Sequence, residues 1–289
     1  MLPQHPDDRD RTVGAGSSAS SRLGRAAQAR ELLKVGFLGQ LAYREELLSQ
    51  WLAIVVEVIV FRQLWRALYG TRSAYAGVTL TQALTYITIT VVVTRFFETW
   101  LVEDVNRQIR EGTIALSLAR PIAYGYAQFL HVTGEALSGL VLVSVPVALV
   151  LGLVLRLPLP ASPGVWLAFL GSVLLGFLTS FYIDYLIALS AFWLTDVGGF
   201  HWSKGSIIAI LGGTFLPLWV YPPAVAQVLH WLPFRGIGYT PVAVFIGEIG
   251  AGSPTLEALG LQLAWVVVLG LLSRRVFAAG VSKVAVQGG

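Results

Sequence analysis

Six long stretches of apolar residues constrain the fold of this chain more than any other feature. They cover residues 47–65, 80–102, 129–155, 164–194, 206–221 and 259–277. About 20 apolar residues cross the roughly 30 Å hydrocarbon core of a bilayer. Charged residues make up only 12% of the chain, about half the share found in soluble domains. Because helices satisfy their own backbone hydrogen bonds in lipid, the pattern predicts an all-α membrane protein with six transmembrane helices.

The part of the chain before the first span divides in two. Residues 1–21 are polar and then rich in Gly, Ser and Ala, which predicts a disordered cytoplasmic tail. Over residues 22–46, Leu33, Phe37 and Leu41 recur at helical spacing among alternating charges. This pattern predicts an amphipathic helix lying at the membrane interface. Residues 47–289 then form the six-span transmembrane domain, and its first span is expected to act as an uncleaved anchor.

The distribution of lysine and arginine predicts the orientation. Most of them flank the N-terminus, the C-terminus and the connections after spans two and four. Positive residues are retained on the cytoplasmic side, so both termini are expected there. The net charge of +4 is not gathered on a soluble module, so membrane lipid is an expected partner and nucleic acid is not. The chain has no cysteine and four scattered histidines, so no metal site is expected.

Two connections look more structured than ordinary loops. Between spans two and three, Val102, Val105 and Ile109 form an apolar face, and Gly112 is placed to end a short helix. Charges four residues apart on the other face, Glu103 with Arg107 and Arg107 with Glu111, support this helix, and residues 113–119 could add a turn or two. Between spans five and six, residues 222–248 hold two short apolar stretches around Pro233 and the Arg235–Gly236 turn. That pattern predicts an outer-side re-entrant or interfacial helical hairpin.

Charged residues inside predicted spans are candidates for a substrate path or for buried polar contacts. They are Glu57, Arg62, Arg95, Glu98 and Asp184. Arg95 and Glu98 are spaced to pair with each other, Arg62 lies near a span end where it can snorkel to the interface, and Glu57 needs a partner from another helix.

Asp184 belongs to a series of small residues at every fourth position of the fourth span. The other members are Ala168, Ser172, Gly176, Ser180 and Ala188. Such a series predicts close helix packing. For Asp184, as for Glu57, a place beside the substrate path stays an open alternative. Two prolines inside spans, Pro146 and Pro217, predict kinks.

The order of these segments resembles that of the ABC-2 type permeases. The likeness is carried by DVNRQIREGTIALSLARP after the second span, by FLPLWVYPPAVAQVLHWLPF, and by a last span that closes in arginines and a Gly pair. It runs from about residue 44 to the C-terminus. One departure is the LSLARP variant, where family members more often carry a leucine before the arginine.

The resemblance implies the permease subunit of an ABC exporter in a bacterial inner (plasma) membrane. Its expected partners are two ABC ATPase subunits and a second permease subunit, identical or related. This chain would bind no cofactor and catalyse no reaction. ATP and Mg²⁺ are expected on the partner ATPase, which agrees with the lack of a G-x-x-x-x-G-K-[ST] loop here. Coupling to the ATPase would fall on Glu103, Asp104, Arg107, Arg110, Glu111, Gly112 and Arg120.

The function expected from the sequence is outward transport of a hydrophobic, amphipathic or lipid-linked solute. An alternative is an ion- or proton-coupled secondary carrier in which Glu57 and Asp184 titrate, although no convincing internal repeat joins the two halves. An intramembrane enzyme would need clustered catalytic groups, and neither H-E-x-x-H nor G-x-S-x-G occurs in the spans.

Overall fold

The computed structural model describes residues 26–39, 44–194 and 197–287. Within these ranges the chain is mostly helical, with one antiparallel hairpin of two-residue strands, β1 (Ala74–Tyr75) and β2 (Val78–Thr79). The predicted all-α class is confirmed in outline. The predicted disordered tail over residues 1–21 lies outside the described residues, as do residues 22–25 and 40–43 of the predicted amphipathic helix.

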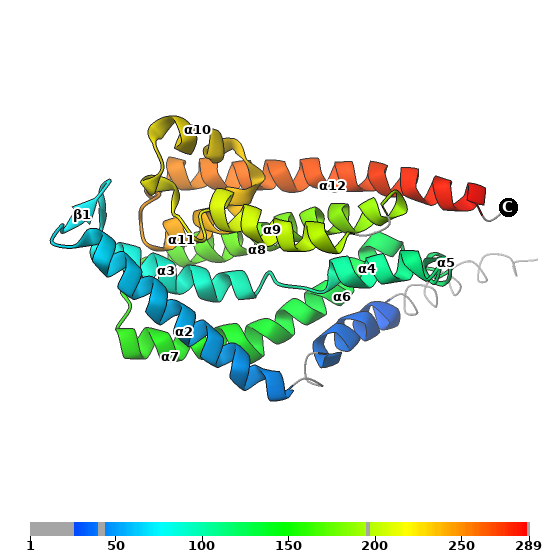
Figure 1. Cartoon of the computed structure of the whole chain (residues 1–289), viewed down its shortest axis with the longest axis horizontal. Coiled ribbons are helices and arrows are strands. Elements are labelled where there is room, and N and C mark those ends of the chain that lie inside the picture. Colours follow the sequence, from blue (N-terminus) through cyan, green and yellow to red (C-terminus); the bar gives the residue numbers. More distant parts are fainter. Residues whose placement is uncertain (1–25, 40–43, 195–196, 288–289) are drawn as a thin grey trace, which may run out of the picture.

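Four helical stretches among the described residues are long and apolar enough to cross a membrane. They are Leu47–Tyr69, Tyr124–Leu155, Pro163–Phe192 and Ser253–Lys283. The helices themselves are α2 (Arg44–Tyr69), α6 with α7 (Tyr124–Gly139 and Val145–Leu155), α8 (Pro163–Leu189) and α12 (Ser253–Gln287). Figure 1 shows α8 and α12 running along the long axis of the molecule, with α2 crossing it obliquely.

The second and fifth predicted spans are shorter than expected. α3 (Leu80–Arg95) has 16 residues and α9 (Gly198–Leu211) has 14. At about 1.5 Å per residue, each falls short of the roughly 30 Å hydrocarbon core. Neither α3 nor α9 is therefore long enough to cross the hydrocarbon core by itself.

The predicted helix over residues 80–102 is wrong beyond Arg95. The Phe96 and Phe97 N–H groups bind the Val93 and Thr94 carbonyls three residues back, at 3.1 and 3.0 Å, so the chain tightens and leaves the helix. Phe97 is buried in the core, and the Phe96 ring packs 5.2 Å from that of Phe177 in α8. Packing of these two aromatic rings into the core beside α8 takes the chain off the helical path, which explains why α3 ends at Arg95.

The predicted helix over residues 206–221 is wrong at both ends, because α9 begins at Gly198 and stops at Leu211. Gly213 takes a φ of +79°, which glycine adopts without the steric cost that a side chain adds. Pro217 consequently lies outside any α-helix and causes no kink there.

Pro146 does distort its helix. A π-helical segment, η1 (Leu140–Ser144), joins α6 to α7 just before it. Pro146 has no N–H to offer the Leu142 carbonyl, its partner in a regular α-helix. That carbonyl instead accepts a hydrogen bond from the Trp51 indole N–H of α2 at 3.0 Å.

Residues 222–248 form the predicted pair of short helices. α10 (Pro223–Trp231) and α11 (Tyr239–Phe245) flank a 3₁₀ turn, η4 (Pro233–Gly236), that contains Pro233 and Arg235. α11 packs against α8 and α3. Figure 1 shows α10 and α11 near the end of the molecule that also carries β1.

The small-residue series of α8 is a packing surface, as predicted. Ser172, Gly176, Ser180, Asp184 and Ala188 are buried. A methyl group at Gly176 would lie 2.8 Å from the Gly236 carbonyl oxygen, so only glycine permits this approach.

Gln262 of α12 ties this region together. Its Nε2 donates to the Gly236 carbonyl at 2.7 Å and to the Ser172 carbonyl at 3.1 Å, and its Oε1 accepts from the Ser172 hydroxyl at 2.8 Å. Three elements, α8, α12 and η4, therefore meet on one amide side chain.

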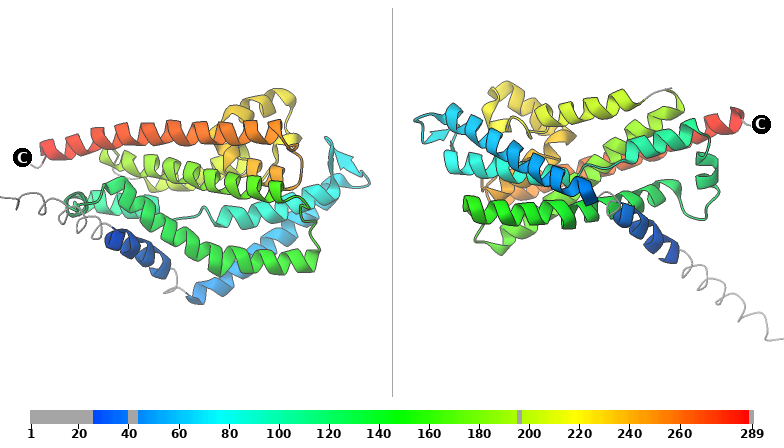
Figure 2. Two further views of the ribbon diagram at one scale, coloured as in Figure 1. Left: turned by 180° about the vertical axis from the view of Figure 1, so that it is seen from behind. Right: turned by 60° about the horizontal axis from the view of Figure 1, so that its bottom comes forward.

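The N-terminal helix (residues 26–39) crosses α6 through glycines. A methyl group at Gly134 would lie 2.2 Å from the Leu33 carbonyl oxygen, and one at Gly36 would lie 2.1 Å from that of His131. Figures 1 and 2 show this helix, in dark blue, alongside the first half of α6. The two backbones approach so closely because neither glycine has a side chain.

We predict that Gly134→Ala displaces the N-terminal helix, because the added methyl group has no space. Trypsin cleavage at Arg30 and Lys34 should become several-fold faster in detergent-solubilised protein. Gly139→Ala is the matched control: it adds the same methyl group to α6, where nothing lies within 4 Å. Equal cleavage rates in the two variants would show that the glycine crossing does not hold this helix.

Candidate functional site

The segment between the second and third predicted spans folds as the sequence indicates. α4 (Leu101–Arg110) is followed by α5 (Ile114–Leu118), and Gly112 between them takes a φ of +71°. Leu101, Val105 and Ile114 are buried in a core that includes Phe181 and Ala188 of α8. The apolar face thus anchors this segment on the helix at the centre of the fold.

The opposite face of this segment presents the predicted coupling residues. Arg107, Arg110, Glu111, Gly112 and Arg120 are exposed, and Glu103 and Asp104 are half-buried. Arg107 Nη2 donates to Asp104 Oδ1 at 2.5 Å, an i,i+3 pairing that the sequence argument did not consider. Leu116 of α5 is 71% exposed beside these charges. A charged surface with one protruding leucine, on a firmly anchored helix, is suited to contact a protein.

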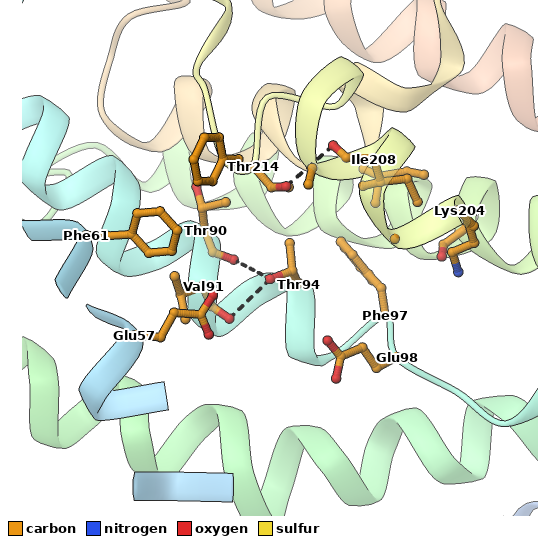
Figure 3. A pocket seen from close by; sticks show the side chains of 15 residues that line it. Glu57, Phe61, Thr90, Val91, Thr94, Phe97, Glu98, Lys204, Ile208 and Thr214 are labelled. Carbon is orange, nitrogen blue, oxygen red and sulfur yellow. Dashed lines mark hydrogen bonds between the residues drawn. The ribbon is translucent and has the colours of Figure 1, made fainter. Parts of the chain in front are cut away.

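A cavity of about 220 Å³ lies between α2, α3, α8 and α9, and Ile237, just after η4, also lines it. Figure 3 shows Glu57, Glu98 and Lys204 at its margin, with Phe61, Val91, Phe97 and Ile208 among the apolar side chains that line it. The structure therefore brings two of the five predicted intramembrane charges, Glu57 and Glu98, to one cavity.

Arg95 links the two carboxylates of this cavity. Its Nη1 lies 3.0 Å from Glu98 Oε1, which confirms the predicted pair, and its Nη2 lies 2.5 Å from Glu57 Oε2. Glu57 thus finds its partner on another helix, as expected. The Arg95 and Glu57 side chains are each about one-third exposed (32% and 34%), so solvent weakens this pair relative to a buried one.

Asp184 forms the most deeply buried ion pair of the cavity region. Its carboxylate oxygens lie 2.5 and 2.6 Å from Lys204 Nζ of α9, and the side chains are 2% and 12% exposed. Sequence reasoning placed Lys204 in a loop because it started the fifth span at residue 206. The partner of Asp184 was missed for that reason.

Arg62 makes a buried polar contact, one of the alternatives expected for it, and does not snorkel to an interface. Its side chain is buried against α3, where Nη1 donates to the Leu84 carbonyl and to the Thr88 hydroxyl, both at 3.0 Å. The helix α3 offers these acceptors within reach of α2, so burial leaves the guanidinium hydrogen-bonded. Arg62 joins two helices and does not line the cavity.

The hairpin of residues 222–248 contains a further polar group that sequence reasoning missed. Glu248 Oε2 accepts from the Tyr239 hydroxyl at 2.6 Å, and Arg235 is buried beside the Tyr239 ring, 5.6 Å from its centre. Burial raises the pKa of Glu248 above its ordinary value, while the Tyr239 hydrogen bond opposes the rise. The three side chains hold the end of α11 against the turn of η4.

We predict that Lys204→Met destabilises the fold by about 3 kcal/mol, because it leaves a buried carboxylate without the lysine ammonium. Adding Asp184→Asn should recover part of that loss, as a double-mutant cycle would show. The measurement is the free energy of unfolding in an SDS titration. Lys34→Met, which breaks an exposed pair with Glu31, is the control and should change stability by less than about 1 kcal/mol. Equal effects of Lys204→Met and Lys34→Met would contradict the buried-pair assignment.

Comparison with known proteins shows the family of this chain. A family model described as ABC-2 family transporter protein matches residues 54–288, which contain α4, α5 and every residue lining the cavity. No curated protein matches the chain. The family is a membrane component of transporters, in keeping with the four long apolar helices. This chain therefore belongs to the ABC-2 family of transporter proteins and is an integral membrane permease.

Proposed function

We propose that this chain is the permease subunit of an ATP-driven exporter that moves a hydrophobic, amphipathic or lipid-linked solute outward. A separate ABC ATPase binds ATP and Mg²⁺ and hydrolyses the nucleotide. The observation that carries the proposal is α4. Its buried side is fixed to α8, and its other side exposes Arg107 and Arg110.

The complete transporter in this proposal holds two permease subunits, identical or related, and two ATPases. Both termini and α4 face the cytoplasm of a bacterial inner (plasma) membrane. α3 and α9 complete six crossings, although each is short. The chain continues from α3 through a turn at residues 96–97 and a short connection to α4, and α11 packs beside α3.

Movement of α4 reaches the cavity through few connections. Residues 96–98 precede α4 by two residues in the chain, and Phe97 and Glu98 among them line the cavity. Arg95 and Glu98 then pass a displacement to Glu57 of α2 through their ion pairs. ATP-driven approach of the two ATPases would pull on α4 and so change the shape of this cavity.

The apolar lining and the few charges of the cavity favour an amphipathic solute. Glu57 and Glu98 lie on one side and Lys204 on another, with aromatic and aliphatic side chains between them. A lipid-like molecule has matching parts, an apolar body and a charged or polar head.

We predict that Arg107→Glu and Arg110→Glu uncouple ATP hydrolysis from transport, because each reverses a charge on the face that meets the ATPase. In proteoliposomes that contain the permease and its ATPase, transport per ATP hydrolysed should fall about tenfold or more, with membrane insertion unchanged. Arg72→Glu is the matched control: Arg72 is an exposed arginine beside β1, at the other end of the molecule from α4. Full coupling in both α4 variants would remove the docking role.

A secondary carrier is the rival function, because Glu57 lines a cavity and Asp184 pairs with a lining residue. A carrier would move its solute in ATP-free vesicles driven by a proton gradient, and Glu57→Gln would abolish that flux. The exporter proposal expects no such flux. It also expects a soluble protein with a Walker A loop to co-purify with the chain in mild detergent.

A further inference from the structure

Three metal-ligating side chains meet where α4 packs against α6. Asp104 comes from α4, and His131 and Glu135 come from α6, one helical turn apart. One ligand atom from each lies within 4.8 Å of the other two. His131 Nε2 is 3.5 Å from Glu135 Oε1 and 3.9 Å from Asp104 Oδ2. Sequence reasoning found no ligand spacing around His131. Asp104 is distant from it in the chain, and only the fold brings the two together.

The donor set is one imidazole nitrogen and two carboxylate oxygens. This combination suits Zn²⁺, Mn²⁺ and Fe²⁺, whereas Ca²⁺ and Mg²⁺ prefer sites built of oxygen alone. Ligands of a tetrahedral zinc ion, at about 2.0–2.2 Å from the metal, lie about 3.3 Å from one another. The two distances to His131 exceed that value by about 0.2 and 0.6 Å. The two carboxylate oxygens lie within 4.8 Å of each other, so side-chain rotations would have to close the site.

The surroundings hold the three ligands in place. Glu135 is 9% exposed, and its other oxygen, Oε2, accepts from the Trp100 backbone N–H at 3.3 Å. Asp104 Oδ1 is bound by Arg107, which leaves Oδ2 on the side of His131. Such secondary contacts orient ligands in metal sites. The N-terminal helix contacts the backbone of α6 at His131. It therefore also holds α6, which carries two of the three side chains.

The charges also favour a cation. Asp104 and Glu135 place two carboxyl groups beside the His131 imidazole, and Arg107, whose side chain is 62% exposed, pairs with only one of them. A divalent cation would balance the charge of these carboxyl groups in a partly buried site.

We propose that Asp104, His131 and Glu135 bind one divalent transition-metal ion, with the remaining coordination positions open to water. The bound ion would join α4 to α6, two elements otherwise separated by α5 and residues 119–123 in the chain. The inference stands on the geometry of the cluster and is independent of the transport role. Without a metal, the three side chains keep only the direct contacts of His131 with the two carboxylates.

Titration with Co²⁺ tests the site, because bound Co²⁺ absorbs visible light in a way that reports its ligands. The full-length chain is purified in detergent with a tag that contains no histidine and is treated with a chelator first. We expect one Co²⁺ per chain and its displacement by Zn²⁺. His131→Ala and Glu135→Gln should each weaken binding at least about tenfold, with unchanged size-exclusion profiles.

Two control variants remove the same groups elsewhere. His230→Ala and Glu257→Gln delete an exposed histidine and an exposed carboxylate and should bind Co²⁺ as the unaltered chain does. His131→Cys keeps a ligand at the position and should show thiolate-to-cobalt charge transfer, which covers the case in which His131→Ala misfolds. No Co²⁺ spectrum from the unaltered chain, or equal affinity after His131→Ala, would overturn the proposal and leave an ion-pair cluster.

Discussion

Backbone polar groups that a helix leaves unpaired have to find partners inside an apolar protein, and the rest of this structure depends on how that is done. At three interruptions of helical structure, a side chain from a distant segment supplies a hydrogen bond to the backbone. Trp51 serves the Leu142 carbonyl freed by Pro146, and the Tyr86 hydroxyl donates to Gly213 where α9 has ended. Gln262 does the same for Gly236 in the turn of η4. Because an unpaired group costs several kcal/mol in lipid, these few contacts permit the short helices that surround the cavity.

Close backbone approach is the second device that shapes the molecule. Gly176 admits the turn of η4 onto α8, and Gly134 admits the N-terminal helix onto α6. In lipid such contacts replace the hydrophobic effect as the basis of helix association. They also place α8 at the centre, in contact with α12, α11 and α4. The cavity and the exposed charges of α4 are therefore attached to the same rigid helix.

Charged side chains join separate helices of this arrangement. Arg95 connects α3 to Glu57 of α2, and Lys204 connects α9 to Asp184 of α8. Asp104 of α4 approaches His131 and Glu135 of α6. Each of these pairings bridges elements that contact the cavity or α4. In the proposed exporter, a change in the position of α4 would alter several of them together.

The sequence by itself determined the helical class, the two-sided helix ending near Gly112, the paired short helices around Pro233 and the Arg95–Glu98 pair. These features follow from residue spacing within one segment, and periodicity along the chain records such local relations. Only the tertiary structure decided that Arg62 is buried against α3, that Lys204 holds Asp184, that α3 stops at Arg95 and that His131 meets Asp104. Those outcomes depend on how far each helix is rotated and where it crosses its neighbour. Such relations arise from contacts between distant segments, and no spacing within a single segment encodes them.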